Sequence, residues 1–240
     1  MGSSPSSASL SLAIIVPPMN PPLALVEEIV LLSLDDTTGA HLPLMPQAIG
    51  YGLAGAVLAD LEMAGRIATR TKCVEVLNAA PTGNPLLDPW LQRIAAQEKC
   101  HSISYWLLVL SDEKHDIEKA VLDHLIERGI LKRQDKKVLW VIGLRRYPTV
   151  HNEERVEVKT RLARLIQGEE MPSHFDATLI SLLQGCYLIS EVFSAELLDG
   201  RSARIASIAD ADPVGREVAA ATREAIDALM LAQSSTTTPF

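Results

Sequence analysis

The chain has 240 residues, of which 48% are hydrophobic and only 4% are aromatic. This length suffices for one large domain or two small ones, and a core built from Leu, Ile, Val and Ala favours helices over a β-sandwich. The formal net charge of −8 argues against a surface that binds nucleic acid as a whole, although a local basic face would escape this argument.

The two ends of the chain differ in composition from its middle. Residues 1–22 predict a disordered leader, because the apolar run Ala8–Val16 follows no Lys or Arg and is too short to span a bilayer. That the protein starts at Met19 instead is a hypothesis. The segment 23–232 contains neither a repeat nor a low-complexity linker, which predicts a single domain, and residues 233–240 form a polar tail.

Apolar residues recur at helical spacing along most of this domain. The helix His174–Phe193 is nearly free of charge from Ala177 to Ser190, so we expect it to be the central buried helix. The predicted helices are Leu23–Leu34, Ala48–Gly65, Leu86–Gln97, Ser104–Leu110, Asp112–Arg128, Asn152–Ile166, His174–Phe193, Ser202–Ala209 and Pro213–Ala232.

Two stretches of alternating residues predict β-hairpins. The first joins Arg66–Arg70 to Cys73–Leu77, and the second joins Ile130–Arg133 to Lys137–Ile142 through a turn at 134–136. Strands this short and scattered do not form a wound sheet. The predicted fold is therefore mainly α, a single helical domain with a central buried helix and two small β-hairpins.

The three cysteines, Cys73, Cys100 and Cys186, are odd in number and widely spaced. They form no C-x-x-C motif, and the six histidines show no metal-ligand spacing, so we expect neither a zinc site nor a disulfide framework. Buried free thiols in a reducing compartment are the expected state. We expect no metal and no cofactor.

A glycine motif, Gly50-x-Gly52-x-x-Gly55, has the spacing of a dinucleotide-binding turn. That turn must follow a central strand, but Pro43 and Pro46 precede the motif and remove two donors from any such strand. We therefore interpret these glycines as positions of close helix packing.

Acidic residues occur in close pairs, such as Asp35/Asp36 and Asp60/Glu62, that we expect to be solvated. No pair lies in a motif with His or Cys, and the chain has no G-x-S-x-G nucleophile motif. We identify no catalytic residue, so the sequence predicts a protein that is not an enzyme.

The segment between residues 127 and 164 holds eleven of the 22 Lys and Arg residues but only five acids. This excess suits an anionic membrane surface, a phosphate headgroup or an acidic partner, and Trp140 is a candidate for the interface. A solvated charged helix with a core tryptophan would give the same pattern. The residues expected to face a membrane or an anion are Arg133, Lys136, Lys137, Arg145 and Arg146, with the apolar loop residues Leu42 and Leu44.

The same region permits a different function. A helix at 112–128 followed by a hairpin that ends at 142 mimics a winged helix, whose recognition helix should be basic. Here six acids outnumber three bases, so we expect no nucleic-acid partner. A soluble interaction or nucleic-acid-binding protein that uses residues 112–142 is the alternative.

Several motifs together resemble the Golgi phosphoprotein 3 family. The resemblance implies one helical domain with small hairpins and no enzyme activity. It also implies a peripheral protein that binds phosphatidylinositol 4-phosphate on Golgi membranes, sorts glycosyltransferases through their cytoplasmic tails and oligomerises through the later hairpin, here residues 130–142. The motifs are LVEEIVLLSLDDTTG at 25–39, GLAGAVLADLEMAGRI at 52–67, APTGNPLL at 80–87, LIERGIL at 125–131 and the apolar segment 179–193.

The lipid pocket of that family uses one Trp and three Arg side chains. By resemblance these positions fall at Met45, Ala54, His115 and Glu118, so none of the four residues is retained. Each lost charge-assisted hydrogen bond is worth about 1.5–3 kcal/mol, which predicts weak recognition of that headgroup. The D-D-x-T-G pattern with these departures suggests a bacterial-type branch. The expected location is the cytoplasm, peripheral on a membrane, which is the Golgi cytosolic face in a eukaryote.

Overall fold

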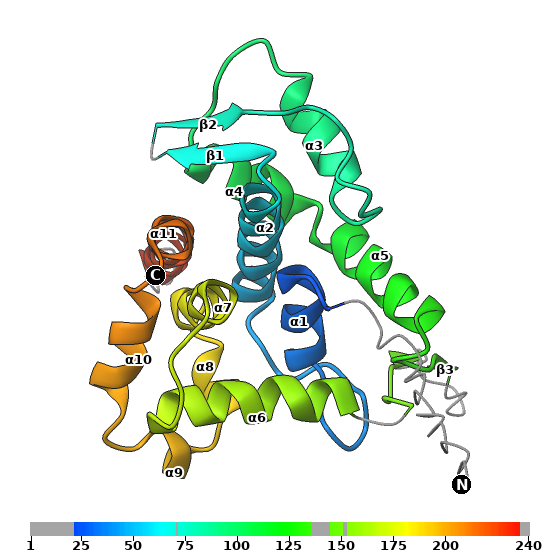
Figure 1. Cartoon of the computed structure of the whole chain (residues 1–240), viewed down its shortest axis with the longest axis vertical. Helices are drawn as coiled ribbons and strands as arrows, with labels where there is room; N and C mark the ends of the chain where they lie inside the picture. The colour runs from blue at the N-terminus through cyan, green and yellow to red at the C-terminus, as the bar shows by residue number, and fades with distance from the viewer. Residues whose placement is uncertain (1–21, 71, 136–144, 151–152, 236–240) are drawn as a thin grey trace, which may run out of the picture.

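The computed structural model describes residues 22–70, 72–135, 145–150 and 153–235. Within these ranges the fold is mainly α, as predicted, with α2 (Pro46–Met63) upright at its centre (Figure 1). The remaining helices are α1 (Leu25–Leu32), α3 (Asp88–Ala95), α4 (Ile103–Asp112), α5 (Lys114–Glu127), α6 (Glu153–Gln167), α7 (His174–Gly185), α8 (Ile189–Val192), α9 (Ala195–Leu198), α10 (Ser202–Ala209) and α11 (Pro213–Ser235).

The core forms where α1, α4, α5, α7 and α11 pack around α2 (Figure 1). The three motif glycines make this packing close. A Cβ on Gly52 would lie 3.3 Å from the sulfur of Cys186, and a Cβ on Gly55 would lie 2.8 Å from Leu182 of α7. These glycines therefore lie at contacts of α2 with its neighbours, as the sequence analysis expected.

Helix α1 is buried on every side, although it contains two acids. The carboxylate of Glu27 accepts a hydrogen bond from the N–H of Ala24 at 2.9 Å. Asp60, near the end of α2, accepts from the N–H groups of Leu25 and Val26 at 3.0 and 3.1 Å. A helix N-terminus leaves such amides without intrahelical partners, so these side chains allow α1 to begin inside the core.

The helix predicted to be the central buried one is shorter than expected. We expected one helix at His174–Phe193, but α7 ends at Gly185 and α8 begins at Ile189. A Cβ on Gly185 would lie 2.7 Å from the carbonyl oxygen of Ala219, so α7 ends against α11. Tyr187 then adopts a left-handed conformation with φ 58°, which breaks the helical path.

The two hairpins lie at opposite ends of the molecule (Figure 1). Strands β1 (Ile67–Arg70) and β2 (Cys73–Val76) pair as predicted. In the second hairpin, however, β3 (Gln134–Asp135) pairs with β4 (Arg145–Arg146), so residues predicted as the turn belong to a strand. Residues 136–144, which include the predicted strand Lys137–Ile142 and Trp140, lie outside the described residues.

The prediction of three buried free thiols was wrong for two of them. Cys73 and Cys100 form a disulfide, with Cα atoms 5.4 Å apart, and Cys100 is exposed. The hairpin β1–β2 brings them together, because the N–H of Val74 donates to the carbonyl of His101 at 2.8 Å. Cys186 is the free, buried cysteine of the described chain, and burial raises the pKa of its thiol to about 12.

Candidate functional site

A small pocket of 170 Å³ lies where the segment between α1 and α2 meets the first turn of α5. Four of its lining residues were selected in the sequence analysis from distant positions: Leu42, Leu44, His115 and Glu118. Met45 lies beside the pocket, at the N-terminus of α2, with 44% of its surface exposed. Ala54, in contrast, is fully buried in α2. The pocket is lined by Ser33, His41, Leu42, Leu44, Ile49, Leu53, Lys114, His115 and Glu118.

The segment before α2 is held in place by backbone hydrogen bonds. The N–H of Leu42 donates to the carbonyl of Ser33 at 2.8 Å, and the N–H of Asp35 donates to that of Ala40 at 2.7 Å. Between them the carboxylate of Asp35 accepts from the N–H and the hydroxyl of Thr38, both at 2.7 Å, and these bonds lower the pKa of Asp35. The D-D-T-T-G sequence is therefore a turn that presents His41 and Leu42 to the pocket.

The polar residues of the pocket carry both signs of charge. The imidazole Nδ1 of His41 lies 3.5 Å from a carboxylate oxygen of Glu118, and Lys114 lies one helical turn before Glu118 on α5. A Cβ on Gly50 would lie 3.1 Å from the side chain of Lys114, so this glycine leaves room for the lysine stem. The arrangement offers an acid and a base to a ligand, whereas a phosphate site would concentrate cations.

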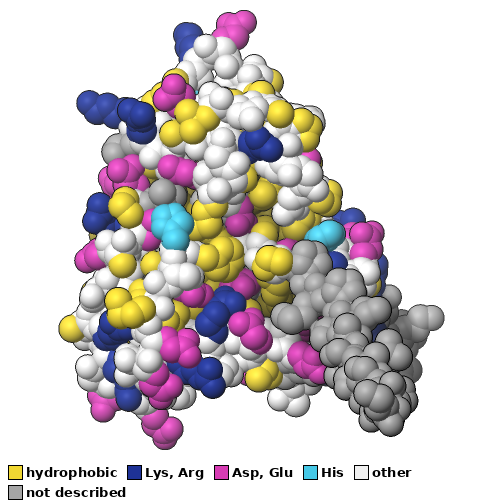
Figure 2. Space-filling model, in the orientation of Figure 1, with side chains coloured by type: hydrophobic (Ala, Val, Ile, Leu, Met, Phe, Trp, Pro, Cys, Tyr) yellow, Lys and Arg dark blue, Asp and Glu magenta, His cyan; other side chains and the backbone are white. Residues whose placement is uncertain are grey.

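Five of the eleven cations between 127 and 164 pair with acids outside that segment. Arg128 binds Glu27 of α1 at 2.9 Å, and Arg161 of α6 binds Glu28 at 2.7 Å. Lys159 binds Asp36 at 2.6 Å. Lys and Arg along α6 accordingly alternate with Asp and Glu on the surface in Figure 2, while hydrophobic side chains gather near the centre of that face. The segment as a whole is therefore not one basic surface.

Within residues 127–164, the second hairpin is the part that lies beside the pocket. The N–H of Tyr147 donates to the carbonyl of Gly39 at 2.8 Å, and the rings of Tyr147 and His41 make an edge contact at 6.1 Å. Arg146, in β4, therefore lies next to the segment that carries His41 and Leu42. Arg133 is exposed just before β3, and Lys136 and Lys137 lie outside the described residues.

Sequence reasoning missed three acids that the fold buries. Glu27, Glu28 and Asp60 expose only 2%, 3% and 7% of their surface, whereas the Asp60/Glu62 pair was expected to be solvated. Burial raises the pKa of Glu28 and of Asp60 to about 7, against the opposing effects of Arg161 and of the backbone hydrogen bonds to Asp60. The available signal was the apolar sequence around Glu27 and Glu28, which is too continuous for a helix with a solvated face.

Arg155 is a basic residue that the fold also buries. Its side chain is 1% exposed and donates to the carbonyl of Asp35 at 2.8 Å, and burial lowers the pKa of its guanidinium. This hydrogen bond holds the Asp35 turn in place, so the part of Arg155 in the fold is structural.

Among the described residues, no group of three or more His, Cys, Asp or Glu side chains could hold a metal ion. No helix in the same ranges is both long and apolar enough to cross a bilayer.

Comparisons with known proteins agree with the motif evidence. The sequence profile of the Golgi phosphoprotein 3 (GPP34) family matches residues 25–229. Vacuolar protein sorting-associated protein 74 of Schizosaccharomyces pombe is 24% identical over 205 residues, which cover 75% of this chain and 60% of that protein. The protein of the same name from Eremothecium gossypii is 25% identical over 167 residues, covering 61% and 50%.

The chain thus spans between half and 60% of the length of these two relatives. The match to the family profile is broader, since it runs from α1 through most of α11 and takes in both hairpins and the pocket. The chain belongs to the Golgi phosphoprotein 3 family.

Proposed function

We propose that this chain is a non-enzymatic adaptor that binds peripherally to an anionic membrane. Its membrane-facing surface consists of the 41–46 segment and the hairpin β3–β4. The observation that carries the proposal is the hydrogen bond between Tyr147 and Gly39, because it joins the basic hairpin to the apolar segment. Met45 is 44% exposed at this surface, and such a side chain gains free energy by entering the interfacial region of a bilayer.

The lipid specificity follows from the pocket. His115 and Glu118 line it where the family has arginines, and Ala54 is buried where the family has a third. A phosphoinositide headgroup would meet Glu118 in place of a cation, so its recognition here is weak. Attraction to the membrane then depends on total surface charge, at about 1 kcal/mol for each Lys or Arg near the surface.

Partners of the adaptor are proposed from the family alone. Family members bind cytoplasmic tails of membrane proteins, and the names of the two relatives refer to vacuolar protein sorting. We propose protein tails as cargo, self-association through the hairpin at 130–142, and a location on the cytosolic face of the Golgi in a eukaryote or in the cytoplasm of a bacterium. No observation favours the alternative use of residues 112–142 for nucleic acid.

Co-sedimentation with vesicles tests this function. Vesicles of phosphatidylcholine alone are compared with vesicles that also contain phosphatidylserine or phosphatidylinositol 4-phosphate. We expect binding to both anionic mixtures at equal surface charge, without preference for the phosphoinositide. The double variant Arg145→Glu/Arg146→Glu should weaken this binding at least about tenfold, since it removes two cations and adds two anions.

A matched control reverses two exposed lysines that precede the disulfide-bonded Cys73 and Cys100, Lys72→Glu/Lys99→Glu, and should bind nearly as well as the unmodified protein. Failure to bind any anionic vesicle, or equal losses in both double variants, would contradict the proposed surface. A strong preference for phosphatidylinositol 4-phosphate would contradict the pocket argument while leaving membrane binding intact.

A further inference from the structure

The disulfide between Cys73 and Cys100 lies at the surface, where β2 runs beside the segment that leads into α4. Cys100 is exposed and Cys73 is half-buried. Attack by a small thiol requires access to one of the two sulfurs, and exposed disulfides are accordingly the labile ones among protein disulfides. This pair is therefore open to thiol chemistry from the side of Cys100.

Positive charge directly precedes both cysteines. The charged residues within three positions of either cysteine are Arg70, Lys72, Glu75, Glu98 and Lys99. Lys72 and Lys99 are the two adjacent to cysteines, and both are exposed. A neighbouring cation stabilises a thiolate, which is the form of cysteine that attacks a disulfide.

The reduced form of the pair fits the same fold. The N–H of Val74 donates to the carbonyl of His101 at 2.8 Å, which keeps β2 beside the start of α4 without the sulfur–sulfur bond. The sulfur of Cys100 lies 3.4 Å from the carbonyl oxygen of Val74, which can accept the proton of its thiol. Leu91 and Ile94 of α3 are buried and anchor the segment between the two cysteines. The two thiols thus stay near each other after reduction, which favours rapid closure of the bond.

The location proposed above makes this reversibility relevant. In a reducing cytoplasm, disulfides of proteins are rare, and those that form are usually transient and catalytic or redox-sensing. This step rests on the proposed cytoplasmic location. The chemistry of the pair itself requires neither a membrane nor a lipid.

We propose that Cys73 and Cys100 form a reversible thiol–disulfide site that exchanges with a low-molecular-weight thiol and its disulfide. In the oxidising direction, the thiolate of Cys100 attacks one sulfur of the small disulfide, whose own sulfur–sulfur bond breaks and releases one small thiolate. The thiolate of Cys73 then attacks the sulfur of Cys100 and expels the second small thiolate. The two leaving thiolates take up the two protons that the cysteines lost, and the small disulfide gains the two electrons. Reduction runs through the same steps in reverse.

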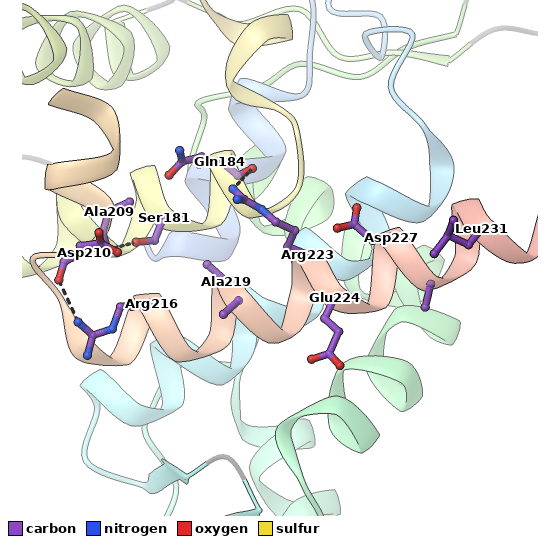
Figure 3. A pocket seen from close by; sticks show the side chains of 12 residues that line it. Ser181, Gln184, Ala209, Asp210, Arg216, Ala219, Arg223, Glu224, Asp227 and Leu231 are labelled. Carbon is purple, nitrogen blue, oxygen red and sulfur yellow. Dashed lines mark hydrogen bonds between the residues drawn. The ribbon is translucent and has the colours of Figure 1, made fainter. Parts of the chain in front are cut away.

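The third cysteine provides an internal reference. Cys186 follows Gln184 of α7 by two residues, and Gln184 lines a groove of 540 Å³ between α7, α10 and α11 (Figure 3). Cys186 is 0% exposed and is not among the described residues that line this groove. Burial raises the pKa of its thiol to about 12. We therefore expect Cys186 not to exchange while the protein is folded.

A titration of the unmodified full chain in glutathione buffers tests whether the site is reversible. Protein purified without reductant is equilibrated at increasing ratios of glutathione to glutathione disulfide, without denaturant, and then quenched, denatured and alkylated. We expect one thiol at oxidising ratios and three at reducing ratios. The same midpoint should be reached from either direction.

Mass spectrometry of the reduced single variants tests the order of the two steps. Cys73→Ser removes the second nucleophile, so glutathione disulfide should leave one lasting glutathione adduct on Cys100. Cys100→Ser should form its adduct at least about tenfold more slowly, because Cys73 is half-buried. The reduced unmodified protein should pass to the disulfide without a lasting adduct.

Lys99→Glu in the C73S background tests the effect of charge. It should slow adduct formation at least about threefold at low salt, since it replaces an adjacent cation with an anion. The matched control is Lys119→Glu in the same background, because Lys119 is 71% exposed on α5, and it should leave the rate unchanged.

A pair that stays oxidised at every ratio until the protein is denatured would be a structural disulfide and would overturn the proposal. Equal rates for C73S and C100S, or for K99E and K119E, would overturn the assigned point of attack. These measurements contain no vesicles, so their failure leaves the proposed membrane binding intact. Loss of vesicle binding would in turn leave the exchange chemistry standing.

Discussion

Arg161 of α6 and Glu28 of α1 are 133 residues apart in sequence, and one guanidinium nitrogen of Arg161 lies 2.9 and 2.7 Å from the two carboxylate oxygens of Glu28. Arg161 also binds Glu157 at 3.0 Å and lies 2.7 Å from Asp176 at the start of α7. One arginine therefore bridges acids from three helices, and its single charge balances one of them. The apolar helix α1 can contain Glu28 because of this pairing.

Replacing Arg161 with Gln should destabilise the protein by about 3 kcal/mol above neutral pH, because it leaves a buried carboxylate without its cation. Burial holds the pKa of Glu28 at about 7, above its ordinary value of 4.5. The folded state therefore binds a proton more readily than the unfolded state, and stability falls as pH rises through 7. Urea unfolding at pH 5 and pH 8 should show a larger loss for R161Q at pH 8.

Arg164→Gln is the control for this experiment. Arg164 is 54% exposed and lies 3.5 Å from the half-exposed Glu170, so its loss should cost about 0.5 kcal/mol or less at both pH values. Equal effects of the two substitutions would contradict a buried ion pair at Glu28.

Asp60 should contribute a second pH dependence. Its carboxylate binds the first two amides of α1, and burial raises its pKa from 3.8 to about 7. Stability from this group is full below pH 4 and falls, by at most about 4 kcal/mol, as pH rises through 7. Asp60→Asn keeps one acceptor oxygen and cannot ionise, so it should cost about 1 kcal/mol at pH 5 and less at pH 8.

Asp60→Ala separates the two contributions, because it removes both hydrogen bonds and should cost about 2–3 kcal/mol at pH 5. The measurement is the free energy of unfolding across pH 4–8. Parallel curves for the unmodified protein and D60N would refute the shifted pKa.

Gly39 should be essential for the contact between the hairpin and the pocket segment. It has φ 62°, and a Cβ there would overlap the backbone of Tyr147 and Pro148. Gly39→Ala should therefore cost about 3 kcal/mol or more, combining a left-handed conformation with a steric clash. It should also weaken vesicle binding, since the hairpin would move away from Met45.

Gly168→Ala isolates the conformational part of this effect. Gly168 has φ 86° and open space around its Cβ position, so the substitution should cost only about 1 kcal/mol and leave vesicle binding unchanged. Thermal unfolding and co-sedimentation of both variants give the comparison. Equal behaviour of G39A and G168A would mean that the Tyr147 contact is dispensable.

Reduction of the Cys73–Cys100 disulfide should lower stability by about 3 kcal/mol, because the bond closes a loop across a sequence separation of 27 residues. Thermal unfolding with and without a phosphine reductant should show this loss in the unmodified protein but not in Cys73→Ser/Cys100→Ser. Alkylation of the denatured chain should count one thiol before reduction, that of Cys186, and three after it. Three thiols in freshly purified, unreduced protein would contradict the disulfide.

Elements that depend on local pattern could be predicted from the sequence. The local patterns of residues 112–128 and 152–166 predicted α5 and α6 to within two residues, and the Thr71-Lys72 turn predicted the first hairpin. Helix boundaries mostly agree because caps and apolar spacing act within a few residues. The break after Gly185 was missed because it depends on Ala219 of another helix.

The candidate site could be predicted only in part. The apolar segment at Leu42 and Leu44 and the positions His115 and Glu118 do meet in one pocket. The surface charge of the segment 127–164 could not be predicted. Its arginines pair with acids 101 and 133 residues away, which a count of charges along the sequence does not include. Lys136 and Lys137 lie outside the described residues, so their position at the surface stays a prediction.

By itself, the sequence determined that this chain is helical, non-repetitive and a member of one family, because apolar period and motif spacing are local properties. Only the tertiary structure decided which charges are neutralised, which cysteines pair and which residues line a common surface. The physical reason is that an ion pair or a disulfide depends on distance in space. In the fold, the two acids of α1 are buried against Arg128 and Arg161, which lie 101 and 133 residues away in the sequence.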